Sequence, residues 1–418
     1  MPELSTDYVA NLRLQFPALA RRVNGSPAIF LDGPAGTQVP HRVIDAVGRA
    51  LGWTNANHGG LFATSEESDA MLDEAHRAVA DFLGAPDPEC VAFGANMTSL
   101  TFAFSRALSR TWQEGDEVIV TQLDHDANVT PWVLAARDRG ITVKVAELRK
   151  NDGTLNTQHL KQLITGRTKL VAVGAASNST GSINPIQEIA AWAHEAGALV
   201  FVDAVHYAPH QLPDVVAWNC DFLACSAYKF FGPHVGILWG KRPLLESLAA
   251  YKVRPAPDSL PGKWMTGTQN HEGIAGVLAA IDYLADIGRE LTQNASLTRR
   301  QALAAAYEAI VSYERKLVGQ LLRGLAELPQ WQVRGITAAE RMAERMPTIS
   351  ITHSTLASAE VSQRLAKAGI FSWHGNYYAL GITEALGLEP RGMVRLGLVH
   401  YNTEDEVART LAALRAIE

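Results

Sequence analysis

Short apolar runs alternate with amphipathic stretches along the first two thirds of the chain. Runs such as EVIVTQL at 117–123 and ALVFVDA at 198–204 are apolar almost throughout. Helical patterns stand between many of them, for example PIQEIAAWAHEAG at 185–197, which ends in glycine. Apolar strands that alternate with helices are typical of a mostly parallel sheet covered on both faces. The expected strands lie at 28–32, 90–94, 117–123, 141–148, 168–177, 198–204, 222–226 and 235–240.

The pattern changes after about residue 290. A long helix is expected at 296–327, followed by the strand-like runs WQVRG, TISITH and MVRLGLV with helical patterns between and after them. Such a mixture indicates a smaller α+β domain. We therefore expect an N-terminal segment at 1–25 that packs on the small domain, a large cofactor-binding domain at 26–290 and a small C-terminal domain at 291–418.

Composition narrows the class of protein. The 418 residues include 43 acidic and 37 basic ones, for a net charge of -6, and no long basic run occurs, so nucleic acid is not an expected partner. No apolar stretch is long enough to span a bilayer, and the first residues do not have the pattern of a secretion signal. Three cysteines without a CxxC pair do not suggest a disulfide framework or a metal site. A cytoplasmic protein without membrane association is the expectation.

Polar side chains follow several of the expected strands. In a sheet of this kind, ligands bind beyond the carboxyl ends of the strands. After CVAFG at 90–94, the residues NMTS at 96–99 open a helix, and N–H groups and hydroxyls at a helix N-terminus form an anion site. The other strand ends carry Asp124, His125, Asn178, Asp203, His206, Ser226 and Lys229.

Lys229 has unusual neighbours for a lysine in a turn. It stands between Tyr228 and the pair Phe230 and Phe231, and a Gly-Pro turn follows. Burial among these rings would favour the neutral, nucleophilic amine. Pyridoxal phosphate needs such an amine for attachment, and it needs a carboxylate beside its pyridine nitrogen, which Asp203 would supply. The pair predicts a pyridoxal phosphate site with Lys229 as its catalytic residue.

The remaining strand-end residues match the other needs of this cofactor. Asn178 and His206 could bond its phenolate oxygen, and His125 could stack on its ring. The phosphate would be held by Met97, Thr98 and Ser226. Taken singly, each residue has an ordinary reading as a helix cap, a turn or a packing residue. The complete set is what one cofactor requires.

These residues carry a resemblance to a known family. The run VDAVHYAPHQLPDVVAWNCDFLACSAYKFFGPHVGILWG resembles the signature of class V aminotransferases, above all the cysteine desulfurase-like branch. LDHDANVTPW and SNSTGSINPI resemble the Glu-His-x-x-Asn and Ser-Asn-x-x-Gly segments of that family. The similarity runs from FLDGPAG, which begins at residue 30, to the C-terminus. It implies a fold type I pyridoxal phosphate enzyme of the α/β class, with a mostly parallel central sheet and a smaller α+β domain.

The resemblance also implies substrate and subunit contacts. MVRLGLVHYNTEDEV resembles the C-terminal segment whose arginine grips a substrate carboxylate, which assigns that role to Arg395. TGTQN at 266–270 resembles the Gly-Thr-Pro-x motif, whose threonine reaches the phosphate of the neighbouring subunit, which points to Thr268. We therefore expect a small amino-acid substrate and a homodimer with active sites at the interface. His58 in NANHGGLFA is a further candidate for the substrate pocket.

The chain departs from the family where a desulfurase carries its catalytic cysteine. The corresponding stretch, FSWHGNYYALGI at 371–382, contains no cysteine, and His374 is the residue there that could exchange a proton with a leaving group. The cysteines lie elsewhere, at Cys90, Cys220 and Cys225. Other departures are Tyr228 before the lysine, and Ala95 and Ser99 near the phosphate site. A persulfide mechanism is therefore not expected.

Several reactions remain open at this point. Carbon–sulfur lyase chemistry by β-elimination is the first hypothesis, and transamination or epimerisation of an amino acid is the alternative. A non-catalytic partner homologue is disfavoured by the intact pair of Lys229 and Asp203. A metal hydrolase built on His125 with Asp124 or Asp126 finds no support in HExxH or comparable ligand spacing, so no metal is expected.

Overall fold

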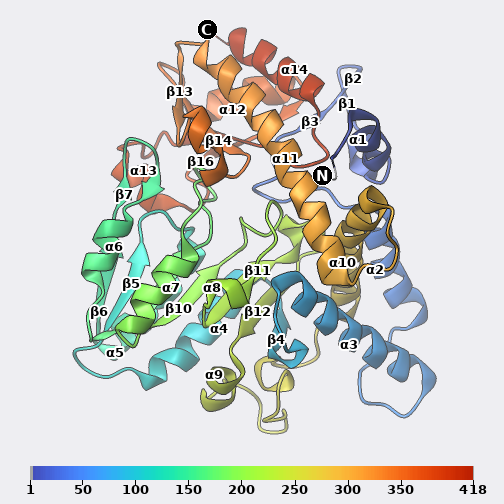
Figure 1. The fold of residues 1–418 in the computed structure, drawn as a ribbon, viewed down its shortest axis with the longest axis vertical. Coiled ribbons are helices and arrows are strands. Elements are labelled where there is room, and N and C mark those ends of the chain that lie inside the picture. The colour runs from blue at the N-terminus through green and yellow to red at the C-terminus, as the bar shows by residue number, and fades with distance from the viewer. Residues whose placement is uncertain (1–2, 418) are drawn as a thin grey trace.

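A seven-stranded sheet forms the centre of the larger part of the molecule (Figure 1). The computed structural model describes residues 3–417. The strand order is β4-β12-β11-β10-β9-β5-β6, and neighbours run parallel except in the two pairs that involve β12. The strands are β4 (Val91–Gly94), β5 (Glu117–Thr121), β6 (Thr142–Ala146), β9 (Thr168–Gly174), β10 (Leu199–Asp203), β11 (Phe222–Ser226) and β12 (Gly236–Gly240). The expected mostly parallel sheet is thus confirmed.

Helices pack on this sheet because its central strands are apolar on both faces. β5, β11 and β12 are buried along their whole length. α4 (Met97–Leu108) packs against β11 and β12, and α7 (Ile186–Glu195) packs against β9 and β10. The other helices of this part are α2 (His41–Trp53), α3 (Ala63–Leu83), α5 (Thr130–Arg139), α6 (Thr157–Leu163), α8 (Val215–Trp218), α9 (Arg242–Ser247) and α10 (His271–Thr292).

A second, antiparallel sheet has the order β13-β14-β17-β16. α11 (Arg299–Ala326) has 28 residues and contacts both α10 and α14, so it connects the two parts of the molecule (Figure 1). At the rise of an α-helix, it is about 42 Å long. The elements of this part are β13 (Trp331–Arg334), β14 (Thr348–His353), α12 (Ser358–Lys367), β16 (Trp373–Gly375), α13 (Leu380–Ala385), β17 (Met393–Gly397) and α14 (Glu404–Arg415).

One expected strand does not join the central sheet. The run at 28–32 forms only β3 (Ile29–Phe30), which pairs in parallel with β15 (Ile370–Phe371) instead of joining the central sheet. α1 (Thr6–Arg13) lies on the same side of the molecule, since Arg13 forms an ion pair of 2.8 Å with Glu406 of α14. The domain boundaries at residues 25 and 290 stay predictions.

The sheet topology brings distant residues to one edge. β5, β9, β10 and β11 run in one direction, and β4 shares it because β4 and β11 are both antiparallel to β12. The carboxyl ends of all five strands therefore meet at the same edge, where ligands bind in such sheets. Within residues 3–417, no helix is long and apolar enough to cross a membrane. The cytoplasmic location stays a prediction.

Candidate active site

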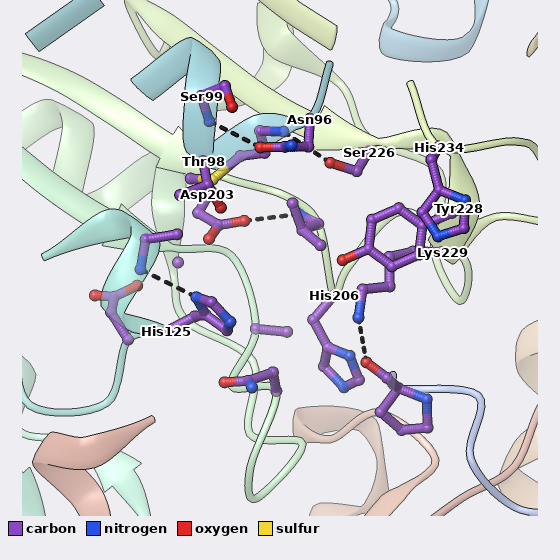
Figure 2. Close-up of a pocket in the computed structure, with 18 residues that line it drawn as sticks. Asn96, Thr98, Ser99, His125, Asp203, His206, Ser226, Tyr228, Lys229 and His234 are labelled. Atoms are coloured by element: carbon purple, nitrogen blue, oxygen red, sulfur yellow. Dashed lines mark hydrogen bonds between the residues drawn. The ribbon is translucent and has the colours of Figure 1, made fainter. Parts of the chain in front are cut away.

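A cavity of about 490 Å³ lies at this edge of the sheet (Figure 2). Its lining comes from the ends of β4, β5, β9, β10 and β11 and from the turn at 33–36. Eight residues expected from the sequence line it together: Met97, Thr98, His125, Asn178, Asp203, His206, Ser226 and Lys229. Asp124 and Tyr228, which received no role from the sequence, also line the cavity, and so does Pro34, which the sequence did not single out.

Lys229 ends the 3₁₀ turn Ala227–Lys229 that follows β11. Its Nζ donates a hydrogen bond of 2.5 Å to the carbonyl oxygen of Pro34 and lies 4.8 Å from the centroid of the Tyr228 ring. Burial, followed by the charge of Arg395, lowers the pKa of this amine to about 7, against the opposing effect of Asp203. A large share of the amine is therefore neutral at neutral pH and able to act as a nucleophile.

Two buried carboxyl groups lie at the base of the cavity. Asp203 ends β10, and its Oδ1 accepts a hydrogen bond of 2.8 Å from the Val205 backbone N–H. Asp124 follows β5 and accepts hydrogen bonds from Thr121 at 2.5 Å and from Asn128 at 3.3 Å. Burial raises the pKa of Asp203 to about 6 and that of Asp124 to about 7, and Asp203 adds to the second shift. A cationic ring nitrogen beside Asp203 would keep that carboxyl ionised.

The N-terminus of α4 offers donors to an anion. The Asn96 side chain caps the helix by accepting a 2.8 Å hydrogen bond from the Ser99 N–H, and the Met97 N–H donates to Ser226 Oγ at 2.9 Å. Thr98 is exposed to the cavity between them. A Cβ on Gly236 would lie 2.3 Å from the Asn96 carbonyl carbon, so only glycine lets β12 approach this helix start.

Two histidines that line the cavity, His125 and His206, are held in neutral forms. His125 Nδ1 accepts a 3.0 Å hydrogen bond from the Ala127 N–H, and burial, followed by Lys229 and Arg395, lowers its pKa to about 4. His206 is fully enclosed, and burial, followed by His210, lowers its pKa well below the usual range. A neutral imidazole at position 125 can lie against a cofactor ring without charge repulsion from Lys229.

Buried polar atoms around the cavity have no partner within residues 3–417. Both ring nitrogens of His206, Oδ1 of Asn178 and Nε of Arg395 are in this condition. Each such group costs about 1–3 kcal/mol when it stays unpaired. The arrangement therefore suits a polar ligand with hydrogen-bonding atoms along its edge, and pyridoxal phosphate meets that description.

Arg395 enters the site from the small antiparallel sheet. It lies on β17, is buried, and donates a 2.9 Å hydrogen bond from Nη1 to the Asn178 carbonyl oxygen. Its Cζ lies 4.4 Å from the centroid of the Tyr377 ring. Burial lowers its pKa to about 10, so the guanidinium stays charged at neutral pH and can bind a carboxylate.

A second cavity of about 710 Å³ adjoins the first one. The two cavities share Lys229, His125 and Asn178 among their lining residues, and the second also contains Arg395 and His374. His374 lies on β16 at the outer wall and is exposed. The segment 373–378 provides this wall, so the stretch that the resemblance equates with the desulfurase loop faces the site.

Two expected residues lie outside these cavities. Thr268 is exposed and lines a separate cavity that also contains Ser99 and His234. His58 is exposed in the loop before α3, with its ring 6.3 Å from that of His271. The roles assigned to Thr268 and His58 stay predictions.

All three cysteines are buried away from the solvent. Cys90 begins an early strand region, and Cys220 and Cys225 flank or lie in β11. Burial raises the pKa of Cys90 and Cys220 to about 12 and raises that of Cys225 further. None lines either of the two cavities that contain Lys229. Their environments disfavour the thiolate that sulfur transfer requires.

The comparisons with known proteins identify the family. The model of the family described as "Aminotransferase class-V" matches residues 29–410. The chain is 32% identical to a cysteine desulfurase of Serratia proteamaculans (strain 568), with 98% of each chain covered. It is 33% identical to the aminotransferase-like protein FGM3 of Gibberella zeae, with 99% of each chain covered.

Solved structures show the same fold. The apo structure of a cysteine desulfurase from Thermococcus onnurineus NA1 superposes with a TM-score of 0.86 at 24% identity, covering 98% of this chain and 97% of that one. The cysteine desulfurase CsdA of Escherichia coli gives a TM-score of 0.83 at 26% identity, covering 98% of each chain. The expected fold type I architecture and the pyridoxal phosphate cofactor are thereby confirmed. From its matched length and its relatives, the chain belongs to the class-V aminotransferase family and is a pyridoxal phosphate-dependent enzyme.

Proposed function

We propose that this enzyme is a carbon–sulfur lyase. It would release a thiol from the Cβ of a cysteine-derived amino acid by β-elimination, with no cysteine of its own as sulfur acceptor. The observation that carries the proposal is that the cavities contain the residues for pyridoxal phosphate chemistry but no cysteine. Lys229, Asp203 and Arg395 surround the cavities, whereas all three thiols are buried outside them.

The chain's own residues would hold the cofactor at the edge of the sheet. Asp203 would bind the protonated ring nitrogen. His206, whose ring nitrogens are both unpaired within residues 3–417, would donate an N–H to the phenolate oxygen. Asn178 would donate the second N–H of its Nδ2, because the first one bonds the Tyr377 carbonyl oxygen. His125 would lie against the ring. The phosphate would be held by Met97, Thr98 and Ser226 at the N-terminus of α4. When bound, pyridoxal phosphate attaches to a lysine amine and withdraws electrons from the substrate Cα.

The remaining residues would bind the substrate and move its protons. Arg395 would hold the α-carboxylate, which fixes the position of the Cα–H bond. Lys229 would accept the proton from Cα, because its pKa of about 7 suits a base at neutral pH. His374 would donate a proton to the departing sulfur from the outer wall. The net reaction consumes one water and yields a thiol, pyruvate and ammonium.

Transamination or epimerisation is the second candidate. It is favoured by the similarity to an aminotransferase-like protein and by the same set of Lys229 and Arg395. These reactions leave the Cβ substituent in place, so their products differ from those of elimination. A role as a non-catalytic partner is disfavoured because a scaffold needs neither the lowered lysine pKa nor Asp203.

The test uses the holoenzyme and a variant without thiols, Cys90→Ala with Cys220→Ala and Cys225→Ala. Both are supplied with S-methylcysteine, and thiol, pyruvate and keto acid are measured per mole of bound cofactor. We expect equal amounts of thiol and pyruvate, and turnover of the variant within about threefold of the parent. A keto acid that retains sulfur, or an inverted substrate, would replace elimination by the second candidate. With free cysteine supplied instead, release of alanine and a trapped persulfide on the parent, together with loss of turnover in the variant, would restore a desulfurase.

We also propose a homodimer, supported by an exposed apolar surface beside Thr268. Trp53 is 80% exposed and Leu61 is 97% exposed, both in the segment from the end of α2 to the start of α3. This segment contacts the start of α10 through His271, whose Nδ1 lies 3.2 Å from the Ala56 carbonyl oxygen, and Thr268 shortly precedes α10. An exposed patch of this kind is typical of a protein interface. A second copy on it would bring Thr268 to the neighbour's phosphate site.

A further inference from the structure

The outer cavity is larger than a cysteine side chain requires. Its volume is about 710 Å³, and it continues from the cavity in which Lys229 and Asp203 lie. A water molecule occupies about 30 Å³ in the liquid, and a thiol group is of similar size. The volume lies in the range of pockets that bind drug-sized ligands. A substrate held by Arg395 at its carboxylate therefore has room for a large group beyond its sulfur.

Aromatic rings form the outer wall of this cavity. Trp373 is 51% exposed and Tyr378 is 75% exposed, and Phe102 lines the same cavity. The Tyr378 ring lies 5.6 Å from that of His125 with an angle of 30° between them, so it extends from the inner site toward the solvent. Exposed aromatic faces at the mouth of a cavity gain free energy when a flat apolar group covers them.

The backbone of this wall is held in an unfavourable conformation. Tyr377 and Tyr378 have φ values of 57° and 58°, in the left-handed region that costs bulky residues roughly 1 kcal/mol or more each. Hydrogen bonds fix it: Asn178 Nδ2 donates to the Tyr377 carbonyl at 3.0 Å, and the Asp126 N–H donates to that of Tyr378 at 2.6 Å. This conformation places Tyr377 over Arg395 and leaves the Tyr378 ring free at the mouth.

Apart from Lys229 and Arg395, which are assigned to the amino-acid end of the substrate, the charged side chains that line this cavity are acidic. Asp126 accepts a 2.7 Å hydrogen bond from Thr130, and Glu389 accepts one of 3.1 Å from Asn376. These two carboxylates would repel an anionic substituent on the substrate sulfur, whereas an uncharged ring would not be repelled.

We propose that the enzyme selects S-substituted cysteines whose sulfur carries an uncharged aromatic group, seated between Trp373 and Tyr378. The inference rests on the proposed lyase function and names its substrate class. In the reaction the Cα–H and Cβ–S bonds break, Lys229 takes the Cα proton, and the sulfur leaves with a proton as the aromatic thiol. Water converts the remaining three-carbon unit to pyruvate and ammonium.

The test measures binding without turnover. The holoenzyme is titrated by calorimetry with three carboxylates that lack the amine and so cannot react: 3-(benzylthio)propanoate, 3-(methylthio)propanoate and 3-(carboxymethylthio)propanoate. We expect the benzyl compound to bind at least tenfold more tightly than the methyl compound, and the doubly anionic compound to bind most weakly. In the double variant Trp373→Ala with Tyr378→Ala, the ratio of affinities for the benzyl and methyl compounds, called the benzyl advantage, should fall below about threefold. Leu14→Ala, a change of an exposed apolar residue directly after α1, is the matched control and should retain the advantage.

Three outcomes would overturn the substrate class. The first is equal affinity for the benzyl and methyl compounds in the parent enzyme. The second is a benzyl advantage that survives in the double variant. The third is a double variant that becomes monomeric by light scattering, which would make the aromatic wall a subunit interface. Failure of the lyase function is recognised separately, because the benzyl preference in binding would then persist while S-benzylcysteine yields no thiol.

Discussion

Lys229 Nζ donates a hydrogen bond of 2.5 Å to the carbonyl oxygen of Pro34, a residue 195 positions earlier in the chain. Pro34 belongs to the GPAG turn at 33–36, which lies close to Tyr228, since a Cβ on Gly36 would be 3.3 Å from that ring. The carbonyl orients the amine within the cavity that also contains Asp203. The lysine that the sequence singles out is therefore positioned by a turn near the N-terminus.

Replacing Lys229 should abolish both covalent attachment and turnover. Borohydride treatment of the holoenzyme should fix the cofactor on the peptide that contains Lys229, as read by mass spectrometry. Lys229→Ala should lose the label and lower kcat by about 10²- to 10⁴-fold, the usual contribution of a general base. Lys316→Ala, at an exposed ion pair with Glu404, is the control and should keep both. A label on another lysine would contradict the assignment.

Cofactor attachment should depend on pH through Lys229. The neutral amine is the reactive form, and its pKa lies at about 7 because burial and then Arg395 disfavour the charge. The attachment rate should therefore rise roughly tenfold per pH unit below about 7 and level off above it. Stopped-flow absorbance of the cofactor-free enzyme mixed with pyridoxal phosphate measures this rate. An ordinary lysine would instead show a rate still rising at pH 9.

Asp203→Asn tests the direction in which Asp203 shifts the pKa of Lys229. Asp203 raises the pKa of Lys229, so its neutralisation should move the midpoint of the attachment rate to lower pH. The same change should weaken turnover more than cofactor attachment, because it removes the carboxylate proposed for the ring nitrogen. A midpoint that moves to higher pH would contradict the electrostatic coupling between the two residues.

Arg395→Gln should lower kcat/KM for amino acids but not for amines that lack a carboxylate. Charge-assisted hydrogen bonds contribute about 1.5–3 kcal/mol, so kcat/KM should fall about 10- to 100-fold. Arg395→Lys should recover part of this loss, since it keeps the charge without the paired donors. Reaction with cysteamine, which lacks the carboxylate, is the control and should change little. An equal loss for both compounds would mean that Arg395 acts mainly in folding.

Gly236→Ala should damage the phosphate end of the site. The added Cβ would lie 2.3 Å from the Asn96 carbonyl carbon, so β12 and the start of α4 must move apart. We expect a stability loss of about 1–3 kcal/mol and weaker binding of pyridoxal phosphate in a fluorescence titration. Gly48→Ala in α2, where a Cβ meets no atom within 4 Å, should instead leave cofactor affinity unchanged. Comparable affinity in both variants would contradict this close approach.

The role proposed for Thr268 can be tested by mixing subunits. A Lys229→Ala chain and a Thr268→Ala chain should each be weakly active as homodimers. A mixed dimer would contain one site with an intact Lys229 and an intact Thr268 from the other chain, so activity should return after subunit exchange. If Thr268 acted within its own subunit, that site would stay incomplete and no recovery would follow.

Local sequence determined the central sheet and the residues at its edge. Apolar strands separated by helices specify parallel strands, and parallel strands bring their carboxyl ends together, so Asp203 and Lys229 could be assigned to one site from their positions alone. Burial among aromatic neighbours likewise indicated the lowered pKa of Lys229, which the structure gives as about 7. Only local periodicity and strand direction were needed for these inferences.

Tertiary packing decided the rest. Pro34 joins the cavity through contacts that no pattern in its own segment reveals, and Thr268 lies outside the cavity. The run at 28–32 pairs with β15, since a two-residue strand gains little by itself and takes the partner that the folded small domain offers. The segment 373–378 contains β16 of the small sheet. It forms the aromatic wall only because the folded chain places it beside the ends of β5 and β9. Such contacts depend on how the two sheets pack against each other. The hydrophobic pattern of either sheet's strands does not determine that packing.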